Sequence, residues 1–483
     1  MTGTFSHPSP YPRDMIGYGR MPPHAKWPGN ARIAVQFVIN YEEGGENNIL
    51  HGDAASEAFL SEIVGAQPWP GLRHMNMESI YEYGSRAGFW RLHRMFTERA
   101  MPVTVFGIAS AMARHPEAVA AMGQAGWEIA SHGFKWIDYR DFAPEDEAAH
   151  IAEAIRLQTE LTGARPLGFY QGRTSEHTHR LTMAEGGFLY SADSYADELP
   201  YWVTGPNGHG GTGPFLMVPY TLDANDMRFA TPQGFNAGDQ FFAYLKDSFD
   251  TLYAEGGTAP KMMSIGLHCR LVGRPGRAAA LARFLDYIQG HSHVWVATRL
   301  DIARHWVLHH PPPGGWDPLT LSKPLFMARF GGIFEHSPWV AERAFDAGFG
   351  IHAASAAGLH AAMVAAMRAG SEAEKLALIR AHPDLAGKLA LARQLTIEST
   401  GEQASAGLDR LTAEELTHFT MLNDAYKARF AFPFIMAVKG RDKAEIIAAF
   451  ATRLKNDAAQ EFATALGEIE KITRLRLADI LPE

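Results

Sequence analysis

Short apolar runs alternate with amphipathic stretches over about the first two thirds of the chain. The runs are apolar on both faces and end at Gly, Pro or polar residues, so they predict β-strands at Ile33–Ile39, Val103–Ala109, Glu128–Ser131, Leu167–Tyr170, Phe188–Ala192, Met217–Tyr220, Met263–Leu267 and Val294–Thr298. Helical periodicity predicts helices between them, among them Phe89–Arg99, Pro144–Leu161 and Asp239–Glu255. Two-sided apolar strands that alternate with helices are typical of a parallel sheet with covered faces. The number of strands favours an α/β fold built as a (β/α) barrel.

A proline- and glycine-rich segment, His309–Trp316, interrupts this pattern. Consecutive prolines hold the backbone extended and glycines follow them, which favours a linker. After the linker almost every stretch has helical periodicity, and Ser371–Glu374 and Thr412–Glu415 have the Ser/Thr-x-x-Glu form that begins a helix. We therefore predict a barrel over residues 1–310, a linker over 311–319 and an all-α domain over 320–483.

Composition and charge exclude several classes of protein. The 483 residues exceed the length of most single domains. The net charge is −9 without a dense Lys/Arg cluster, so nucleic acid is not an expected partner. A single cysteine, Cys269, excludes an intrachain disulfide and suits a reducing compartment. The first residues lack the apolar core of a signal peptide and no run reaches about 18 apolar residues, so we expect a soluble, cytoplasmic protein with no membrane partner.

Polar side chains follow several predicted strands at the points where those strands end. They are Glu42, Glu43, His132, Arg173, Asp193 and His268. In a barrel of parallel strands the carboxyl ends meet at one face, and active sites lie there. The sequence therefore predicts one site that gathers carboxylates, imidazoles and a guanidinium.

Five segments of this half carry a resemblance to a known family. They are VINYEEGGE (38–46), EIASHGFKW (128–136), GFYQGRTS (168–175), YSADSYADELPYW (190–202) and IGLHCRLVGRPGR (265–277). Together they resemble the polysaccharide-deacetylase superfamily, in particular its allantoinase branch, over residues 1 to about 310. The resemblance implies a distorted (β/α) barrel of polysaccharide-deacetylase type that opens the hydantoin ring of allantoin by hydrolysis.

The same resemblance bears on metal binding. Metal-dependent members of the superfamily use a carboxylate after the first strand and a His-x-x-x-His after the third. Here Glu42 or Glu43 and then His132 fill the first two positions. Trp136 stands at the remaining one, and an indole cannot serve as one of the roughly three protein ligands that a catalytic zinc needs. We predict no metal and no cofactor, with recruitment of His268 as the arrangement that would restore a metal site.

Hydrolysis without a metal needs a base for the water and a proton donor for the leaving nitrogen. Glu43 or His132 is the candidate base, and His268 is the candidate acid. Arg173 and Arg274 are candidates for orienting the ureido group or stabilising the oxyanion. Further candidate substrate contacts are Glu42, Trp136 and Asp193. The residue types leave open which of the two glutamates is the base, whether Trp136 is a core aromatic and whether Arg274 lies in a solvated turn.

The helical half carries a second set of polar residues. Pro383 forces His382 out of helical geometry at a junction between helices. The segment Ser399–Gln403 fits either a helix cap or a ligand-binding segment. Phe432–Ile435 breaks a helix and leaves backbone groups available. Arg476 continues the apolar stripe of the last helix, so its guanidinium must reach solvent or meet an anion.

Segments of this half resemble a second family. They are FEHSPWVAERAF (334–345), AHPDLAGKLA (381–390), ESTGEQASAGLDRL (398–411), LNDAYKARFAFPFIMAVKG (422–440) and ITRLRL (472–477). They resemble the 2-oxo-4-hydroxy-4-carboxy-5-ureidoimidazoline (OHCU) decarboxylase family over about 320–483. The resemblance implies that His382 and Glu402 are the acid/base pair. It also implies that Ser399, Gln403, Arg476 and the backbone of Ile435 hold the substrate, without a cofactor.

The two resemblances imply adjacent reactions, since the decarboxylase family makes (S)-allantoin and the allantoinase family consumes it. We therefore predict a bifunctional enzyme that acts on small-molecule ureides and, as the families imply, forms homo-oligomers. The alternative is a metal-dependent carbohydrate or amide deacetylase joined to a non-catalytic helical assembly module. That alternative requires a complete His-x-x-x-His, which Trp136 interrupts.

Overall fold

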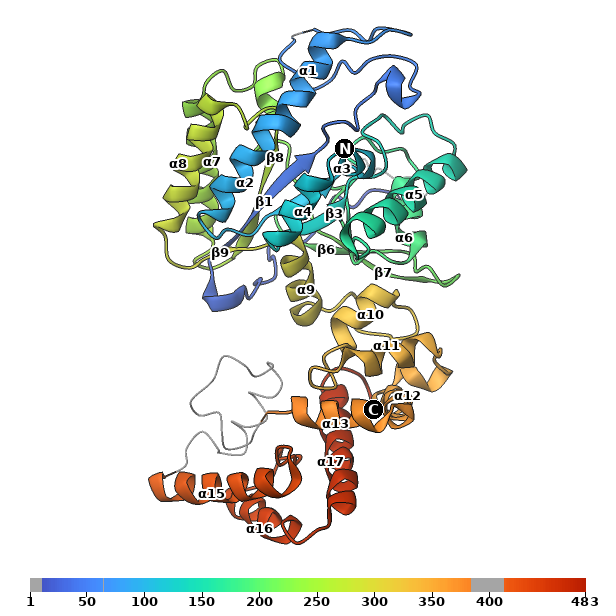
Figure 1. Cartoon of the computed structure of the whole chain (residues 1–483), viewed down its shortest axis with the longest axis vertical. Helices are drawn as coiled ribbons and strands as arrows, with labels where there is room; N and C mark the ends of the chain where they lie inside the picture. The colour runs from blue at the N-terminus through green and yellow to red at the C-terminus, as the bar shows by residue number, and fades with distance from the viewer. Residues whose placement is uncertain (1–10, 64, 384–411) are drawn as a thin grey trace, which may run out of the picture. The chain divides into compact units, whose positions relative to one another are not determined.

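The computed structural model describes residues 11–63, 65–383 and 412–483 (Figure 1). The chain divides into two compact units, Met1–His310 and Pro311–Glu483. None of the helices in the described ranges has the length and apolar character that crossing a bilayer requires.

A nine-stranded sheet forms the centre of the first unit. Its strands are β1 (Ile33–Tyr41), β2 (Thr104–Gly107), β3 (Glu128–Ser131), β4 (Gly168–Phe169), β5 (Tyr190–Ser191), β6 (Tyr201–Pro206), β7 (Thr212–Met217), β8 (Lys261–His268) and β9 (Val294–Val296). The order along the sheet is β6-β7-β5-β4-β3-β2-β1-β8, and β9 pairs with the start of β1. All neighbours are parallel except β6 and β7. The predicted α/β class is confirmed, with the sheet forming a half-barrel.

Strand β1 lies inside this sheet and is buried along its whole length. Its Asn40 is opposite His268 of β8 on one side and Phe106 of β2 on the other. Because these strands are parallel, the polar residues at their carboxyl ends lie at the same edge of the sheet.

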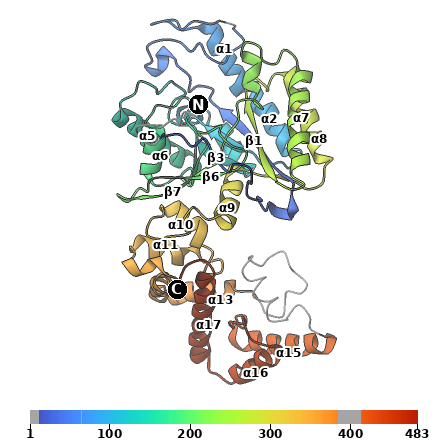
Figure 2. The same ribbon diagram turned by 180° about the vertical axis from the view of Figure 1, so that it is seen from behind.

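The first unit also contains helices. They are α1 (Met75–Tyr83), α2 (Phe89–Thr97), α3 (Ala109–Arg114), α4 (Pro116–Gln124), α5 (Pro144–Thr162), α6 (Thr178–Glu185), α7 (Gly238–Glu255), α8 (Pro275–Gln289) and α9 (Arg299–His309). Packing contacts join α7, α8, α2, α4, α5 and α6 in that order, as a layer that Figure 1 and Figure 2 show from opposite sides. Aromatic side chains such as Phe37, Phe96 and Phe284 fill the space between this layer and the sheet.

Two strands differ from the sequence prediction. The pattern does not predict β6, because its residues are half-exposed and it ends in Gly205 and Pro206, which are depleted in strands. The predicted run Met217–Tyr220 overlaps β7 only at Met217. Pro219 lies in that run and lacks the N–H that a continuing strand would donate, so the pairing ends before it.

The second unit is helical in its described residues, which confirms the predicted helical region. Its helices are α10 (Lys323–Phe330), α11 (Pro338–Asp346), α12 (Ala356–Ala369), α13 (Glu372–Ala381), α15 (Ala413–Phe430), α16 (Lys443–Arg453) and α17 (Ala458–Ala478). Helix α12 packs against α11 and α17, and α15 packs against α16. The predicted Ser371–Glu374 capping box is present at the start of α13.

Candidate active sites

A pocket of about 610 Å³ lies at the carboxyl ends of the strands in the first unit. Its lining includes the predicted site residues Glu42, His132, Trp136, Arg173 and His268. These residues follow β1, β3 and β4 or end β8. The parallel sheet therefore brings together side chains that are far apart in the sequence.

Alternation along β1 decides which of two adjacent glutamates reaches the pocket. Asn40 and Glu42 line the pocket, whereas Tyr41 between them lies in the core. The side chain of Glu43 points away from the pocket, as that of Tyr41 does. Its Oε1 accepts a hydrogen bond from the backbone N–H of Arg270 at 3.1 Å. Glu42 is therefore the carboxylate that a substrate can reach.

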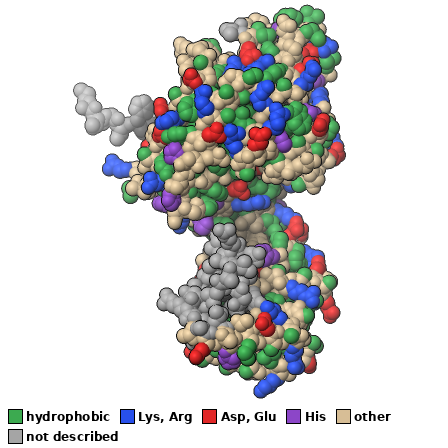
Figure 3. All heavy atoms as spheres, turned by 60° about the vertical axis from the view of Figure 1, so that its left-hand side comes forward, with side chains coloured by type: hydrophobic (Ala, Val, Ile, Leu, Met, Phe, Trp, Pro, Cys, Tyr) green, Lys and Arg blue, Asp and Glu red, His purple; other side chains and the backbone are tan. Residues whose placement is uncertain are grey.

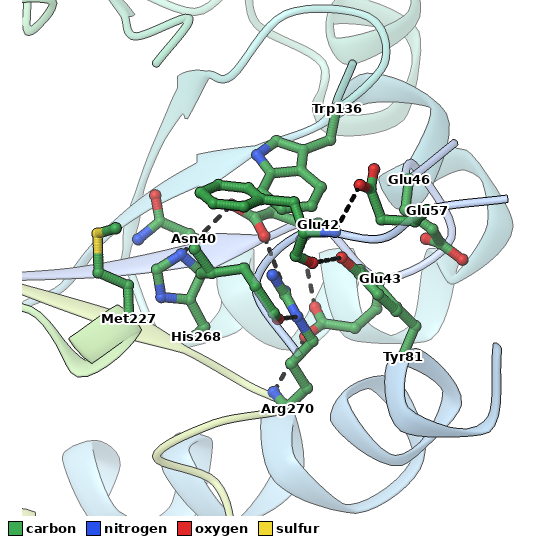
Figure 4. Close-up of polar contacts among 12 residues, drawn as sticks. Asn40, Glu42, Glu43, Glu46, Glu57, Tyr81, Trp136, Met227, His268 and Arg270 are labelled. Atoms are coloured by element: carbon green, nitrogen blue, oxygen red, sulfur yellow. Dashed lines mark hydrogen bonds and ion pairs between the residues drawn. The ribbon is translucent and has the colours of Figure 1, made fainter. Parts of the chain in front are cut away.

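Glu42 lies among three nitrogen groups. Its Oε1 is 3.3 Å from Nε2 of His132 and 3.4 Å from Nε2 of His268. Its Oε2 is 2.7 Å from Nη1 of Arg270 (Figure 4). Burial alone would raise the pKa of Glu42, but the charges of Arg270 and His268 outweigh burial and hold this pKa well below its usual range. Glu42 is thus ionised at neutral pH.

Asp226, which no sequence pattern marks, fixes the His268 ring. The Nδ1 N–H of His268 donates to Oδ1 of Asp226 at 2.6 Å, and its backbone N–H donates to Oδ2 at 2.7 Å. Burial alone would lower the pKa of His268, but the carboxylates of Glu42 and Asp226 outweigh burial and raise the pKa to about 9. The imidazole is therefore cationic at neutral pH and able to donate a proton.

His132 is the second imidazole of the pocket. Its Nδ1 N–H donates to the carbonyl oxygen of Tyr170 at 3.0 Å, which directs Nε2 toward Glu42. Its ring also packs against Phe106 and Tyr170. His132 and Glu42 are therefore placed to share a proton.

Arg173 and Trp136 form a wall of the pocket. The guanidinium of Arg173 lies 5.1 Å from the centre of the Trp136 ring and 5.5 Å from that of Phe59. Its Nη1 donates to the backbone oxygen of Trp136 at 3.5 Å and is 3.5 Å from Oε2 of Glu57. A guanidinium over an aromatic face suits a flat polar group such as a ureido group.

Asp193 does not line the pocket directly. Its carboxylate accepts hydrogen bonds from the backbone N–H groups of Gln171 and Gly172, both at 2.8 Å. Burial raises the pKa of Asp193. These bonds hold the turn that leads into Arg173, so the structure gives Asp193 a positioning contact in place of a substrate contact.

Arg274 also lies outside the lining of this pocket. Its guanidinium lies 3.6 Å from the centre of the Tyr83 ring and 3.5 Å from Oε2 of Glu62. It borders a separate hollow of about 520 Å³ together with Arg277. The geometry therefore separates Arg274 from the carboxylate and imidazoles around Glu42.

The donor set around Glu42 does not fit a catalytic zinc ion. One of its carboxylate oxygens is already engaged by Arg270, and His268 is cationic and bonded to Asp226. Within the described ranges, no group of three or more His, Cys, Asp or Glu residues is arranged to hold a metal ion. A protein zinc site needs about three free donors, which this arrangement does not offer.

In the second unit, His382 ends α13 with an extended backbone (φ −69°, ψ 140°), as the following proline requires. The ring is buried, and its Nδ1 N–H donates to the carbonyl oxygen of Leu378 at 2.9 Å. Burial lowers the pKa of His382 to about 4, and the charge of Arg476 acts in the same direction. The neutral ring therefore carries its lone pair on Nε2.

Arg476 is held by Glu335, which lies in the segment 334–345 that resembles the decarboxylase family but is not among the predicted site residues. Its Nη2 is 3.0 Å from Oε2 of Glu335, and its Nη1 donates to the carbonyl oxygen of Ile333 at 3.0 Å. Both charged side chains are buried, and both act electrostatically on His382. His382, Glu335 and Arg476 thus form one polar cluster.

The predicted site also includes the backbone of Ile435 and the side chains of Ser399, Glu402 and Gln403. The carbonyl oxygen of Ile435 accepts a hydrogen bond from Nη1 of Arg453 at 2.6 Å, so this backbone group is engaged within the protein. Ser399, Glu402 and Gln403 lie outside the described residues.

Both units are similar to known proteins. The polysaccharide deacetylase family matches residues 77–184, and the OHCU decarboxylase family matches residues 320–478. The crystal structure of PuuE allantoinase is 62% identical, covers 62% of this chain and 98% of that chain, and has a TM-score of 0.61. The structure of a probable polysaccharide deacetylase from Pseudomonas aeruginosa PAO1 is 61% identical, with coverages of 62% and 99% and a TM-score of 0.60.

The second unit has its own relatives. The OHCU decarboxylase of Haloferax volcanii is 43% identical over 154 residues, which are 32% of this chain and 88% of the relative. The chain therefore belongs to the polysaccharide deacetylase family through its first unit and to the OHCU decarboxylase family through its second.

Proposed function

We propose that this chain is a bifunctional enzyme of ureide breakdown. The second unit decarboxylates OHCU to (S)-allantoin, and the first unit hydrolyses (S)-allantoin to allantoate. The likeness to PuuE allantoinase and to OHCU decarboxylases supports this assignment. The observation that carries the hydrolytic half is the ionised Glu42 beside the cationic His268 in one pocket. The proposed division of labour is residues 1–310 for hydrolysis, 311–319 for the linker and 320–483 for decarboxylation.

Ring opening adds one water across an amide C–N bond. A carboxylate with so low a pKa as that of Glu42 is a weak base alone, so His132 next to it receives the proton as the water oxygen attacks the carbonyl carbon. His268 then gives its proton to the leaving nitrogen as the C–N bond breaks. The proton taken from water returns to His268 through Glu42, whose Oε1 is close to both rings. This assignment makes His132 the base and Glu42 the proton relay, whereas the sequence offers Glu43 or His132 as the base and Glu42 as a substrate contact.

Substrate orientation is assigned to the wall of the pocket. Arg173 and Trp136 offer a cation and a flat apolar face to the ureido group and the hydantoin ring. Asp193 acts through the turn that precedes Arg173 and does not touch the substrate. Arg274 has no contact role in this proposal because it lies in a separate hollow.

Decarboxylation is assigned to the cluster around His382. Arg476 binds the carboxylate of OHCU. As carbon dioxide leaves, the electron pair of the breaking C–C bond passes into the adjacent C=N group, whose nitrogen takes up a proton from the solvent. The neutral His382 takes the proton of the substrate hydroxyl and returns it to the carbon that carries the ureido group, which yields one enantiomer. Glu402, Ser399 and Gln403 keep the roles that the family resemblance implies.

A cytoplasmic location, homo-oligomeric assembly and independence of nucleic acid belong to the same proposal. The free thiol of Cys269 is buried, which suits a reducing compartment. On the face that Figure 3 shows, Lys and Arg side chains are interspersed with Asp and Glu. A phosphate backbone requires a concentrated positive surface instead. The homo-oligomer rests on the family resemblance alone.

Two assays on the purified full-length protein test the proposal. The protein, treated with chelator, is given (S)-allantoin and allantoate is measured; separately it is given freshly generated OHCU and the formation of (S)-allantoin is followed by circular dichroism. We expect both reactions to be accelerated, with Glu42→Gln abolishing only the first and His382→Ala only the second. Release of acetate from acetylated chito-oligosaccharides, with no action on allantoin, would establish the carbohydrate deacetylase alternative instead.

A further inference from the structure

Arg270 is a fully buried cation behind the pocket of the first unit. Its Nη1 is 2.7 Å from Oε2 of Glu42 and 3.6 Å from Oε1 of Glu43. Its Nε donates to the carbonyl oxygen of Leu60 at 3.2 Å. The guanidinium is therefore anchored on two carboxylates at the end of β1, and Figure 4 shows it next to both of them.

Aromatic rings complete the surroundings of this guanidinium. It lies 4.3 Å from the centre of the Tyr81 ring and 5.1 Å from that of Trp136. Rings at these distances attract a cation through their negative faces, and this attraction is strongest where water is excluded. The site around Arg270 is thus built for a positive charge.

The backbone that carries Arg270 is also tightly fitted. A side-chain carbon at Gly88, on the helical segment before α2, would lie 2.0 Å from the carbonyl oxygen of Cys269. Glycine at this position lets the helix press against the turn that follows β8. The backbone next to Arg270 is therefore packed directly against this helix.

A carboxylate flanked by imidazoles is a typical donor set for divalent ions. Here Glu42 has His132 and His268 on one oxygen and Arg270 on the other. A second cation brought to Glu42 would be repelled by a fixed positive charge within a few ångströms, in a buried environment where screening is weak.

We propose that Arg270 is a resident cation that takes the place of a metal ion on Glu42: it excludes divalent ions and keeps Glu42 aimed into the pocket. It is a positioning residue, since it does not line the pocket and acts through Glu42. Its benefit to hydrolysis rests on the proposed allantoinase function, whereas its exclusion of metal does not.

Binding of Co²⁺ and Zn²⁺ to full-length variants tests this role without relying on turnover. The parent variant is Trp136→His, which supplies a further imidazole beside Glu42 and His132. It is compared with Trp136→His/Arg270→Lys, which keeps a cation, and with Trp136→His/Arg270→Met, which removes it. Equilibrium dialysis gives the dissociation constants, and the visible absorption of Co²⁺ reports coordination. If the methionine variant fails to fold, Arg270→Gln replaces it.

We expect the uncharged double variant to bind one Co²⁺ or Zn²⁺ at least about 100-fold more tightly than Trp136→His, and the lysine variant to bind as weakly as the parent. Equal affinity in Trp136→His and the uncharged variant would overturn the proposal. So would a folded uncharged variant that binds no metal. With Trp136 intact, we also expect Arg270→Met to lose allantoin hydrolysis and Arg270→Lys to restore part of it. If the wild type hydrolyses no allantoin, the proposed function fails while the metal titration still decides the role of Arg270.

Discussion

The Nδ1 atom of His268 lies 2.6 Å from Oδ1 of Asp226, although 42 residues separate the two in the chain. Oδ2 of the same carboxylate accepts the backbone N–H groups of His268 and Val272 at 2.7 and 2.9 Å. Both oxygens of Asp226 are therefore engaged by the segment that carries the imidazole. Asp226 fixes the orientation of the ring and favours its protonated form.

Replacing Asp226 by Asn shifts the pH dependence of allantoin hydrolysis. The pKa of His268 is raised to about 9, so its acidic form is present below that pH and kcat/KM falls as pH rises through about 9. In Asp226→Asn the fall begins at lower pH, because the neutral amide no longer favours the imidazolium, and the neutral-pH rate drops by roughly 10²–10⁴-fold. A complete pH–rate profile measures this, and an unchanged upper break would contradict the role of Asp226.

The same interaction affects folding stability in a defined direction. A histidine whose pKa is raised by folding stabilises the native state below its unfolded value of 6.5 and loses that contribution as pH rises through about 9. Wild-type protein should therefore lose stability over this interval more steeply than Asp226→Asn. Urea unfolding at several pH values makes the comparison.

The adjacent glutamates give a matched pair of variants. Glu42→Gln should lower kcat for allantoin by at least about 10²-fold, because the pocket loses its ionised carboxylate. Glu43→Gln should lower it by about tenfold or less, since Glu43 does not line the pocket and burial raises its pKa. Near-ultraviolet circular dichroism checks that both variants are folded. Larger loss in Glu43→Gln than in Glu42→Gln would reverse the assignment.

The buried ion pair of the second unit predicts an effect on both stability and turnover. Arg476 and Glu335 are almost inaccessible, so Glu335→Gln leaves a buried guanidinium without its counter-charge and costs about 3–5 kcal/mol. Arg368→Met is the control, because Arg368 pairs with Glu470 near the surface and its loss costs at most about 1 kcal/mol. For both variants of the full-length protein, the urea concentration that halves the rate of OHCU decarboxylation is measured. Equal effects of the two substitutions would contradict the buried pair.

His382 predicts an unusual pH profile for decarboxylation. Burial lowers its pKa to about 4, so the ring stays neutral from pH 8 down to about 5 and kcat/KM should be level over that range. Folding stability moves in the corresponding direction: it is lost as pH falls from 6.5 toward 4, because the unfolded chain binds the proton first. Stopped-flow rates, corrected for spontaneous decay, test the profile, and a break near pH 6.5 would show an exposed histidine.

The sequence predicts those parts of the site that follow strands. Glu42, His132 and His268 come directly after or at the end of apolar runs, and a parallel sheet has to bring such positions together. His382 is marked by the proline that follows it. Local patterns of this kind carry enough information because backbone geometry alone decides where these residues lie.

Other parts depend on tertiary packing and leave no local signal. Asp226 begins a short 3-10 helix between β7 and α7, and only the fold brings it to His268. Arg270 lies two residues beyond β8, where a charged side chain is expected to be exposed to solvent. In the structure its side chain is fully buried and contacts Glu42. Likewise, the residues next to Glu335 in the sequence do not indicate that its ion-pair partner is Arg476. Each of these partners is decided by contacts between distant segments.

We propose that two sites on one chain, around Glu42 and around His382, carry out consecutive reactions. A single progress curve tests it most directly: freshly generated OHCU is supplied to the full-length Glu42→Gln variant and to the wild type, and (S)-allantoin and allantoate are followed together. The account predicts that the variant converts OHCU to (S)-allantoin at the wild-type rate and then stops, while the wild type continues to allantoate. Allantoate formation by the variant at the wild-type rate, or no enantiomeric excess from either protein, would contradict it.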